Sequence, residues 1–366
     1  MNPNLRKLLA LAALVLQTTG AVILTRYSKA AVSDGPAYHS TTLVVGAEVT
    51  KLALSLLLIF ASDVSDDPSF RDGSRTRFQA WSAIVRRENF ENPADTLKLA
   101  VPAGLYTLQN NLVYVALANL EATTFQVGYQ MKVITTAVLS VIILHRKLSS
   151  KKWLSLFLLT AGIVATQIDS SAGRVDQSTQ EQSFFVGIVS VITCGCSSAL
   201  AGVYFEKILK GTNPSLWVRN AQLAFFSVLL GVAGTVVTDG PMVMLDPRKF
   251  FQGWNELVIY IVMIQAAGGL IVAMVVKYAD NIVKGFATAL SIVLCGAVSA
   301  KLFGFVPSTK FVVGSTMVVA ASTMYALPDK PPEKPAPLTA VVVGGGGSFA
   351  DDGKRGAESP PGPPRA

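Results

Sequence analysis

Long runs of apolar residues, separated by short polar links, follow one another along the chain. A helix that crosses a bilayer needs about 20 mostly apolar residues, because the hydrocarbon core is about 30 Å thick. These runs are continuous and do not alternate with period two, which favours helices over the strands of a barrel. The pattern therefore predicts an all-α polytopic membrane protein with about ten transmembrane helices. Their approximate spans are 5–25, 41–61, 98–118, 123–144, 153–169, 184–206, 215–237, 256–276, 284–305 and 309–327.

Two longer polar segments interrupt this pattern. Residues 62–97 form the one sizeable loop, in which we expect a short surface helix around "TRFQAWSAIVRR". Residues 328–366 are rich in proline and glycine and have no apolar period, so we expect a disordered tail. The membrane domain is then residues 1–327.

The charge distribution bears on orientation and partners. Charged residues are 15% of the chain and hydrophobic ones 51%, with a formal net charge of +8. Outside the tail, most lysine and arginine residues fall on the face from which odd-numbered runs start. The positive-inside rule places that face, and both termini, in the cytosol. Orientation and anionic lipid explain the net charge, and no nucleic-acid partner is needed.

The run 123–144 contains the motif "FQVGYQMK", with a lysine far from either end. A lysine at the centre of a membrane helix costs about 2.5–3.5 kcal/mol on insertion scales, and such residues usually face a cavity. Phe125, Tyr129 and Lys132 are spaced i, i+4, i+7 and share one helical face, where they would suit an aromatic base, a ribose and a phosphate. The alternative is that Lys132 reaches the near interface, but it would have to pass residues 133–144.

A second polar stripe lies in the preceding run. Tyr106, Gln109 and Asn110 are spaced i, i+3, i+4 and again share a face. The short link "ANLEA" makes the two helices antiparallel neighbours, so the two stripes would line one cavity near the middle of the membrane. The alternative is that the amides hydrogen-bond between helices and simply hold them together.

Two further groups of charged and polar residues lie within or between apolar runs. Lys277, Asn281 and Lys284 are spaced i, i+4, i+7 between two runs, where a binding face and a solvated cytosolic loop are both consistent with the pattern. Glu48 and Lys51 lie three residues apart within a run, so their charges can neutralise each other. We interpret that pair as structural or gating.

Signatures of other chemistry are missing from the sequence. The chain has no phosphate-binding glycine loop, no Ser/His/Asp set and no intramembrane carboxylate pair. The three cysteines lie in apolar runs and the two histidines are isolated, so they predict no metal site. We therefore expect neither an enzyme nor a cofactor.

Three long motifs closely resemble the pyrimidine nucleotide-sugar transporter family, part of the drug/metabolite transporter superfamily. They are "YTLQNNLVYVALANLEATTFQVGYQMK", "AGVYFEKILKGTNPSLWVRN" and "VVKYADNIVKGFATALSIVL", and they look closest to UDP-galactose and UDP-N-acetylglucosamine transporters of the Golgi. The resemblance implies two five-helix halves, residues 1–169 and 184–327, in inverted orientation. Five is odd, so a repeated unit must invert, in agreement with two cytosolic termini.

The resemblance also implies a substrate-binding site. It makes Lys132 and Lys284 the phosphate contacts and Asn220 a base-binding residue, with Ser198 and Tyr204 beside the site. It favours a functional role for Asn281. A nucleotide sugar carries two negative charges at neutral pH, which two cavity lysines would offset. The full set expected to bind substrate is Tyr106, Gln109, Asn110, Phe125, Tyr129, Lys132, Ser198, Tyr204, Asn220, Asn281 and Lys284.

From this resemblance we expect an antiporter that moves UDP-galactose from the cytosol into the Golgi lumen in exchange for UMP. UDP-N-acetylglucosamine is the alternative cargo. An alternative of another class is a non-transporting Golgi membrane scaffold for glycosyltransferases. We expect a multi-pass Golgi membrane protein, with the ER membrane as the alternative, and a homo-oligomer or Golgi glycosyltransferases as further partners.

Overall fold

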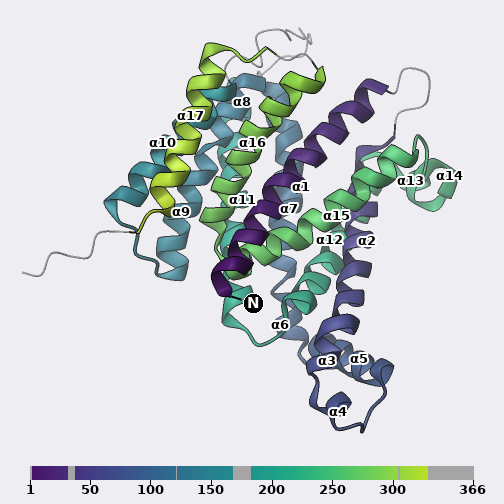
Figure 1. Ribbon diagram of the computed structural model, residues 1–366. Coiled ribbons are helices and arrows are strands. Elements are labelled where there is room, and N and C mark those ends of the chain that lie inside the picture. Colours follow the sequence, from purple (N-terminus) through teal and green to yellow (C-terminus); the bar gives the residue numbers. More distant parts are fainter. Residues whose placement is uncertain (1, 32–37, 121, 168–182, 304–305, 329–366) are drawn as a thin grey trace, which may run out of the picture. The chain divides into compact units, whose positions relative to one another are not determined.

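The computed structural model of the protein describes residues 2–31, 38–120, 122–167, 183–303 and 306–328. In these residues all regular secondary structure is helical, and no strand occurs among them. Residues Met1–Pro328 form one compact unit (Figure 1). The predicted disordered tail lies outside the described residues, apart from Pro328.

Each apolar run corresponds to a helix, except that the run 123–144 is divided into two. Seven of the membrane-length segments are long and apolar enough to cross a membrane. The prediction of a polytopic all-α membrane protein is confirmed, but the number ten is not. The helices are α1 (Pro3–Ala31), α2 (Ser40–Leu58), α7 (Ala100–Asn119), α8 (Ala122–Tyr129), α9 (Met131–Leu144), α10 (Ser150–Gln167), α11 (Phe184–Gly211), α12 (Leu216–Thr238), α15 (Glu256–Tyr278), α16 (Asn281–Phe303) and α17 (Thr309–Ala326).

Three helices fall short of the length and composition of a membrane span. α7 carries three consecutive amide side chains, Gln109, Asn110 and Asn111, which lower its hydropathy. α10 and α17 have only 18 residues each, and α10 begins with two lysines. All three nevertheless pack against longer helices of the bundle.

Side-chain caps fix where several of the helices begin. At four N-termini a serine or asparagine side chain accepts a hydrogen bond from the backbone N–H three residues further on, which satisfies one of the free donors of the first turn. These N-caps are Ser183, Ser215, Asn255 and Ser308. The starts of α11, α12, α15 and α17 are therefore set by local chemistry.

The break between α8 and α9 lies at Gln130. The Gln130 N–H donates to the Val127 carbonyl at 3.2 Å, and the Val133 N–H donates to the Gln130 carbonyl at 3.0 Å. Both bonds span three residues, so the turn is tighter than an α-helical one. Tyr129 and Lys132 lie on either side of this turn.

The polar segment 62–97 contains the predicted surface helix, α5 (Arg77–Arg86), which begins with a capping box of Thr76 and Gln79. The rest of the segment consists of short helical pieces (Figure 1). They are the π-helices Ile59–Asp63 and Arg87–Glu91 and the α-helices α3 (Val64–Asp66), α4 (Pro68–Arg71) and α6 (Pro93–Leu97). Two further short helices, α13 (Pro241–Leu245) and α14 (Pro247–Phe250), follow α12.

The main interfaces each join a helix that precedes residue 168 to a helix that follows residue 182. α1 packs against α15 and α16, α2 against α12, α7 against α11, and α10 against α17 (Figure 1). The last pair crosses at Gly162 and Gly314, where a Cβ added to Gly162 would lie 2.9 Å from the Gly314 carbonyl oxygen. Only glycine permits so close a backbone approach.

Candidate functional site

A cavity of about 890 Å³ lies between α2, α7, α11, α12 and α15. Five of the residues singled out from the sequence line it, drawn from three of these helices. They are Glu48 and Lys51 on α2, Tyr106 and Asn110 on α7, and Asn220 on α12. The cavity thus combines an aromatic ring, two amides and an ion pair, which are groups able to bind a nucleoside.

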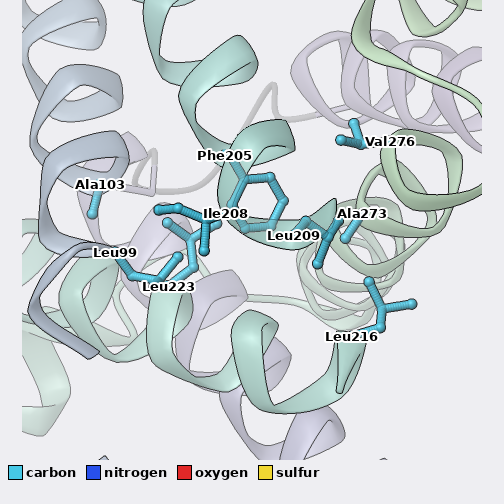
Figure 2. Close-up of a cluster of buried hydrophobic side chains, with 9 residues drawn as sticks. All are labelled: Leu99, Ala103, Phe205, Ile208, Leu209, Leu216, Leu223, Ala273 and Val276. Atoms are coloured by element: carbon cyan, nitrogen blue, oxygen red, sulfur yellow. The ribbon is translucent and has the colours of Figure 1, made fainter. Parts of the chain in front are cut away.

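One end of the cavity is closed by a cluster of buried apolar side chains, here called the closing cluster (Figure 2). Ala103, Phe205 and Leu223 belong both to this cluster and to the cavity lining. The cluster forms where α7 and α12 begin and where α11 and α15 end. Its members are Leu99, Ala103, Phe205, Ile208, Leu209, Leu216, Leu223, Ala273 and Val276.

The cavity extends to the opposite end of the helices. There it is lined by residues near the start of α2 and the ends of α7 and α12, including His39, Tyr114 and Asp239. His39 Nδ1 lies 3.4 Å from Asp239 Oδ1, and the Thr41 hydroxyl donates to the same carboxylate. Tyr114 is 65% exposed. The cavity is therefore accessible from this end, away from the closing cluster.

The predicted pair of Glu48 and Lys51 forms in the cavity wall. Lys51 Nζ lies 2.5 Å from Glu48 Oε2, and the lysine residue is only 7% exposed. The Lys51 chain lies across Gly269 of α15, where an added Cβ would be 2.6 Å from Lys51 Cδ. Gly269 therefore provides the space that the lysine side chain occupies.

A second group of predicted residues lies on α8, α9 and α11. The rings of Phe125 and Tyr129 stack with centroids 5.6 Å apart, and Lys132 Nζ is 4.0 Å from the centroid of the Tyr129 ring. The Tyr129 hydroxyl donates to Ser198 Oγ at 3.4 Å. The shared face inferred from the spacing of these three residues exists, and α11 packs against it.

Lys284 lies in the first turn of α16, close enough to Lys132 for their charges to interact. In the part of the chain that the structure describes, neither lysine forms an ion pair. Both side chains are partly accessible. Two such ammonium groups can bind an anion with more than one charge, such as a diphosphate.

The two groups adjoin but do not share the cavity lining. Val113 and Ala116 of α7 pack in one apolar cluster with Phe125 and Tyr129 of the second group, so α7 lies next to α8 there. Phe125, Tyr129, Lys132, Ser198 and Lys284 do not line the cavity in this conformation.

Three more predicted residues lie away from the cavity. Gln109 has a buried Oε1 that accepts no hydrogen bond from the residues that the structure describes. Asn281 is 4% exposed and packs against Gly202 of α11. Tyr204 packs against the closing cluster. None of the three belongs to the cavity lining in this conformation.

Two charged residues that no sequence pattern singled out, Glu206 and Arg219, are buried completely. Arg219 donates to Asp95 of α6 and, at 2.8 Å, to Gln222 Oε1. Gln222 in turn donates to the Glu88 carbonyl at 3.0 Å. The signal was present, because Arg219 lies inside a run read as apolar. The segment 62–97 is therefore held against α12 and is more than a solvated loop.

The Asp95 carboxyl is the titratable partner in this contact. Its partial burial disfavours the charged form, but hydrogen bonds from Arg219 and Lys98, together with their positive charges, outweigh burial. The pKa of Asp95 is therefore lowered. The carboxylate is ionised at neutral pH and pairs with the buried guanidinium.

Comparison with known proteins identifies the family. A sequence model of the nucleotide-sugar transporter family matches residues 2–326. The UDP-N-acetylglucosamine transporter of Mus musculus is 45% identical over 339 residues, which are 92% of this chain and 99% of that protein. The UDP-galactose translocator of Bos taurus is 43% identical over 322 residues, 88% of this chain and 78% of that protein.

A solved crystal structure shares the fold, with a TM-score of 0.57 at 11% identity, over 87% of this chain and 95% of its own. The resemblance stated from the three motifs is confirmed by the family match and by these relatives. The prediction that the protein is not an enzyme is confirmed as well, because the family consists of transporters. The chain belongs to the nucleotide-sugar transporter family.

Proposed function

We propose that the protein exchanges a cytosolic UDP-sugar for lumenal UMP across the Golgi membrane. The observation that carries this proposal is the pair of partly accessible lysines, Lys132 and Lys284, beside a cavity lined by Tyr106, Asn110 and Asn220. An aromatic ring and amides suit a nucleoside, and two cations suit its phosphates. Lysine binds phosphate as a point charge and without a bidentate clamp, which suits a carrier that must release its cargo.

The orientation follows from the distribution of lysine and arginine. The positive-inside rule places the end of the bundle at which α7 and α12 begin in the cytosol. The closing cluster lies at that end, and the cavity reaches the other. This conformation then faces the lumen, from which UMP would enter. The first membrane helix of the first half, α1, packs against the third of the second half, α15. In the same way, α11, the first of the second half, packs against α7, the third of the first half, and this symmetry supports two repeated halves.

Two cargoes have specific support. The motifs "ATTFQV" and "ADNIVKGFATALSI" look closer to UDP-galactose carriers than to CMP-sialic acid carriers, and the relatives include both UDP-N-acetylglucosamine transporters and UDP-galactose translocators. Both share the UDP part that the proposed site would bind. A homo-oligomer, glycosyltransferase partners and the choice between Golgi and ER stay predictions from the sequence.

The test is uptake by proteoliposomes that contain the purified protein and are preloaded with UMP. Radiolabelled UDP-galactose, UDP-N-acetylglucosamine and CMP-sialic acid are offered separately. We expect entry of one or both UDP-sugars and no entry of CMP-sialic acid. Failure of all three to enter, with protein shown to be folded by its thermal melting curve, would reject the proposal in favour of a non-transporting scaffold.

A further inference from the structure

The side chain of Glu206 is completely buried on α11, directly after Phe205 of the cavity lining. Its Oε1 accepts hydrogen bonds from Arg146 and, at 2.7 Å, from Lys210 Nζ. Its Oε2 accepts the backbone N–H of Asn281 at 3.0 Å. A buried carboxylate is retained only when such partners offset the loss of hydration.

These partners come from the link that follows α9, from α11 itself and from the start of α16. Arg146 lies two residues after the end of α9, and the residue between them, His145, has a left-handed backbone conformation. The Arg146 N–H donates back to the Ser140 carbonyl at 3.3 Å, which closes the end of the helix. Lys210 belongs to α11, and Asn281 begins α16. Glu206 therefore ties the end of α9 and the start of α16 to α11.

Two further contacts reinforce this junction. Arg146 Nη1 lies 3.2 Å from Asp280 Oδ2, directly before α16. Lys210 Nζ also donates to the Ala279 carbonyl at 2.5 Å. The junction thus contains two carboxylates and two cations, and it lies at the end of the bundle that holds the closing cluster.

The helices joined in this way are the ones that carry the two substrate lysines. Lys132 is on α9, and Lys284 is one turn into α16, where it interacts electrostatically with Glu206. A diphosphate bound by Lys132 and Lys284 would bring negative charge towards the Glu206 carboxylate. It would repel Glu206 and attract the cations that now pair with it.

We propose that Glu206 is a positioning residue that couples occupancy of the lysine site to closure of the cavity at the closing cluster. While the site is empty, Glu206 holds α9 and α16 against α11. The arriving phosphates compete with Glu206 for positive charge and loosen this junction, so that the closed end opens only when nucleotide is bound. This inference rests on the exchange proposed above.

The test uses Glu206→Gln, which keeps the shape of the side chain and removes its charge. Proteoliposomes loaded with labelled UMP are assayed for efflux with and without external UDP-sugar. We expect wild-type efflux to depend strongly on external UDP-sugar. In Glu206→Gln the ratio of stimulated to unstimulated efflux should fall by roughly tenfold, within the range usual for coupling between sites.

Three further variants keep the test decisive. Glu206→Asp retains the charge and should recover part of the ratio, which a purely structural loss would not explain. Glu256→Gln removes an exposed glutamate from the first turn of α15 and should leave the ratio unchanged. If Glu206→Gln does not fold, Arg146→Gln can replace it. This variant removes one cation from the junction and should also lower the ratio of stimulated to unstimulated efflux.

The outcomes separate this inference from the proposed function. Absence of UDP-sugar-stimulated efflux in wild type would reject the exchange itself. Normal exchange in wild type, together with an unchanged ratio in a folded Glu206→Gln or Arg146→Gln protein, would overturn the coupling role of Glu206 alone.

Discussion

The ammonium of Lys132 lies over the ring of Tyr129, with Nζ 4.0 Å from the ring centroid. A cation held in this way gains about 0.5–2 kcal/mol, depending on how far it is desolvated. Hydrogen bonds to charged groups are stronger, at about 1.5–3 kcal/mol each. The aromatic face therefore holds the lysine in place but leaves it available to a phosphate.

Removal of either lysine should weaken nucleotide binding. Lys132→Ala or Lys284→Ala would each delete one charged contact, which corresponds to a roughly ten- to hundredfold loss of UMP affinity. Binding can be measured by scintillation proximity, and uptake should fall to background. Both proteins should remain folded in a melting experiment. Wild-type uptake by either variant would contradict a two-lysine site.

Tyr129 offers a way to separate its ring from its hydroxyl. Tyr129→Ala removes both the surface beneath Lys132 and the hydrogen bond to Ser198, so we expect a clear rise in the KM for UDP-sugar. Tyr129→Phe keeps the ring and should stay close to wild type. Equal defects in the two variants would assign the role to the hydroxyl group instead.

Gly269→Ala tests the wall formed by Lys51. The added methyl group would lie 2.6 Å from Lys51 Cδ, so the lysine must move away from Glu48. Overpacking of this kind costs about 1–3 kcal/mol, and the melting temperature and transport should both fall. Gly104→Ala is the matched control, since a Cβ there would meet none of the described residues within 4 Å. Equal behaviour of the two variants would show that the position of Lys51 is unimportant.

The contact of Asp95 with Arg219 predicts a response to acid. Because the pKa of Asp95 is lowered on folding, its contribution to stability is fully present above the unfolded value near 3.8. That contribution is lost as the pH falls through the lower, folded value. Asp95→Asn leaves Arg219 buried without its charged partner and should cost about 3 kcal/mol at neutral pH.

Melting curves of purified protein between neutral and acid pH provide the measurement. The difference in melting temperature between wild type and Asp95→Asn should be constant at neutral pH and should shrink below about pH 4. A difference that stays the same down to the lowest pH would show that Asp95 is not the titrating partner of Arg219.

The positions of the helices could be predicted from the sequence because apolar runs of membrane length have few alternatives. Which side of each helix faces the cavity could not be predicted as well. Tyr106, Gln109 and Asn110 share a broad face, yet of these three only Tyr106 and Asn110 reach the cavity. The buried Gln109 Oε1 accepts no hydrogen bond within the described part of the chain. The cavity therefore includes only part of the polar face that the spacing predicts on α7.

The buried ion pairs were beyond prediction for a different reason. Glu206 and Arg146 are 60 residues apart, and Arg219 and Asp95 are 124 residues apart. Spacing along one helix carries no information on such partners. A single charged residue within an apolar run, such as Arg219, is nevertheless a signal that a buried partner exists elsewhere in the chain.

The most direct test of the proposed exchange is whether UMP inside the vesicles drives the entry of UDP-sugar. Proteoliposomes with identical protein content are prepared with and without UMP inside, and initial uptake of labelled UDP-galactose and UDP-N-acetylglucosamine is measured in both. We predict rapid entry of at least one UDP-sugar into the UMP-loaded vesicles and only slow entry into the empty ones. Equal rates in loaded and empty vesicles would contradict exchange.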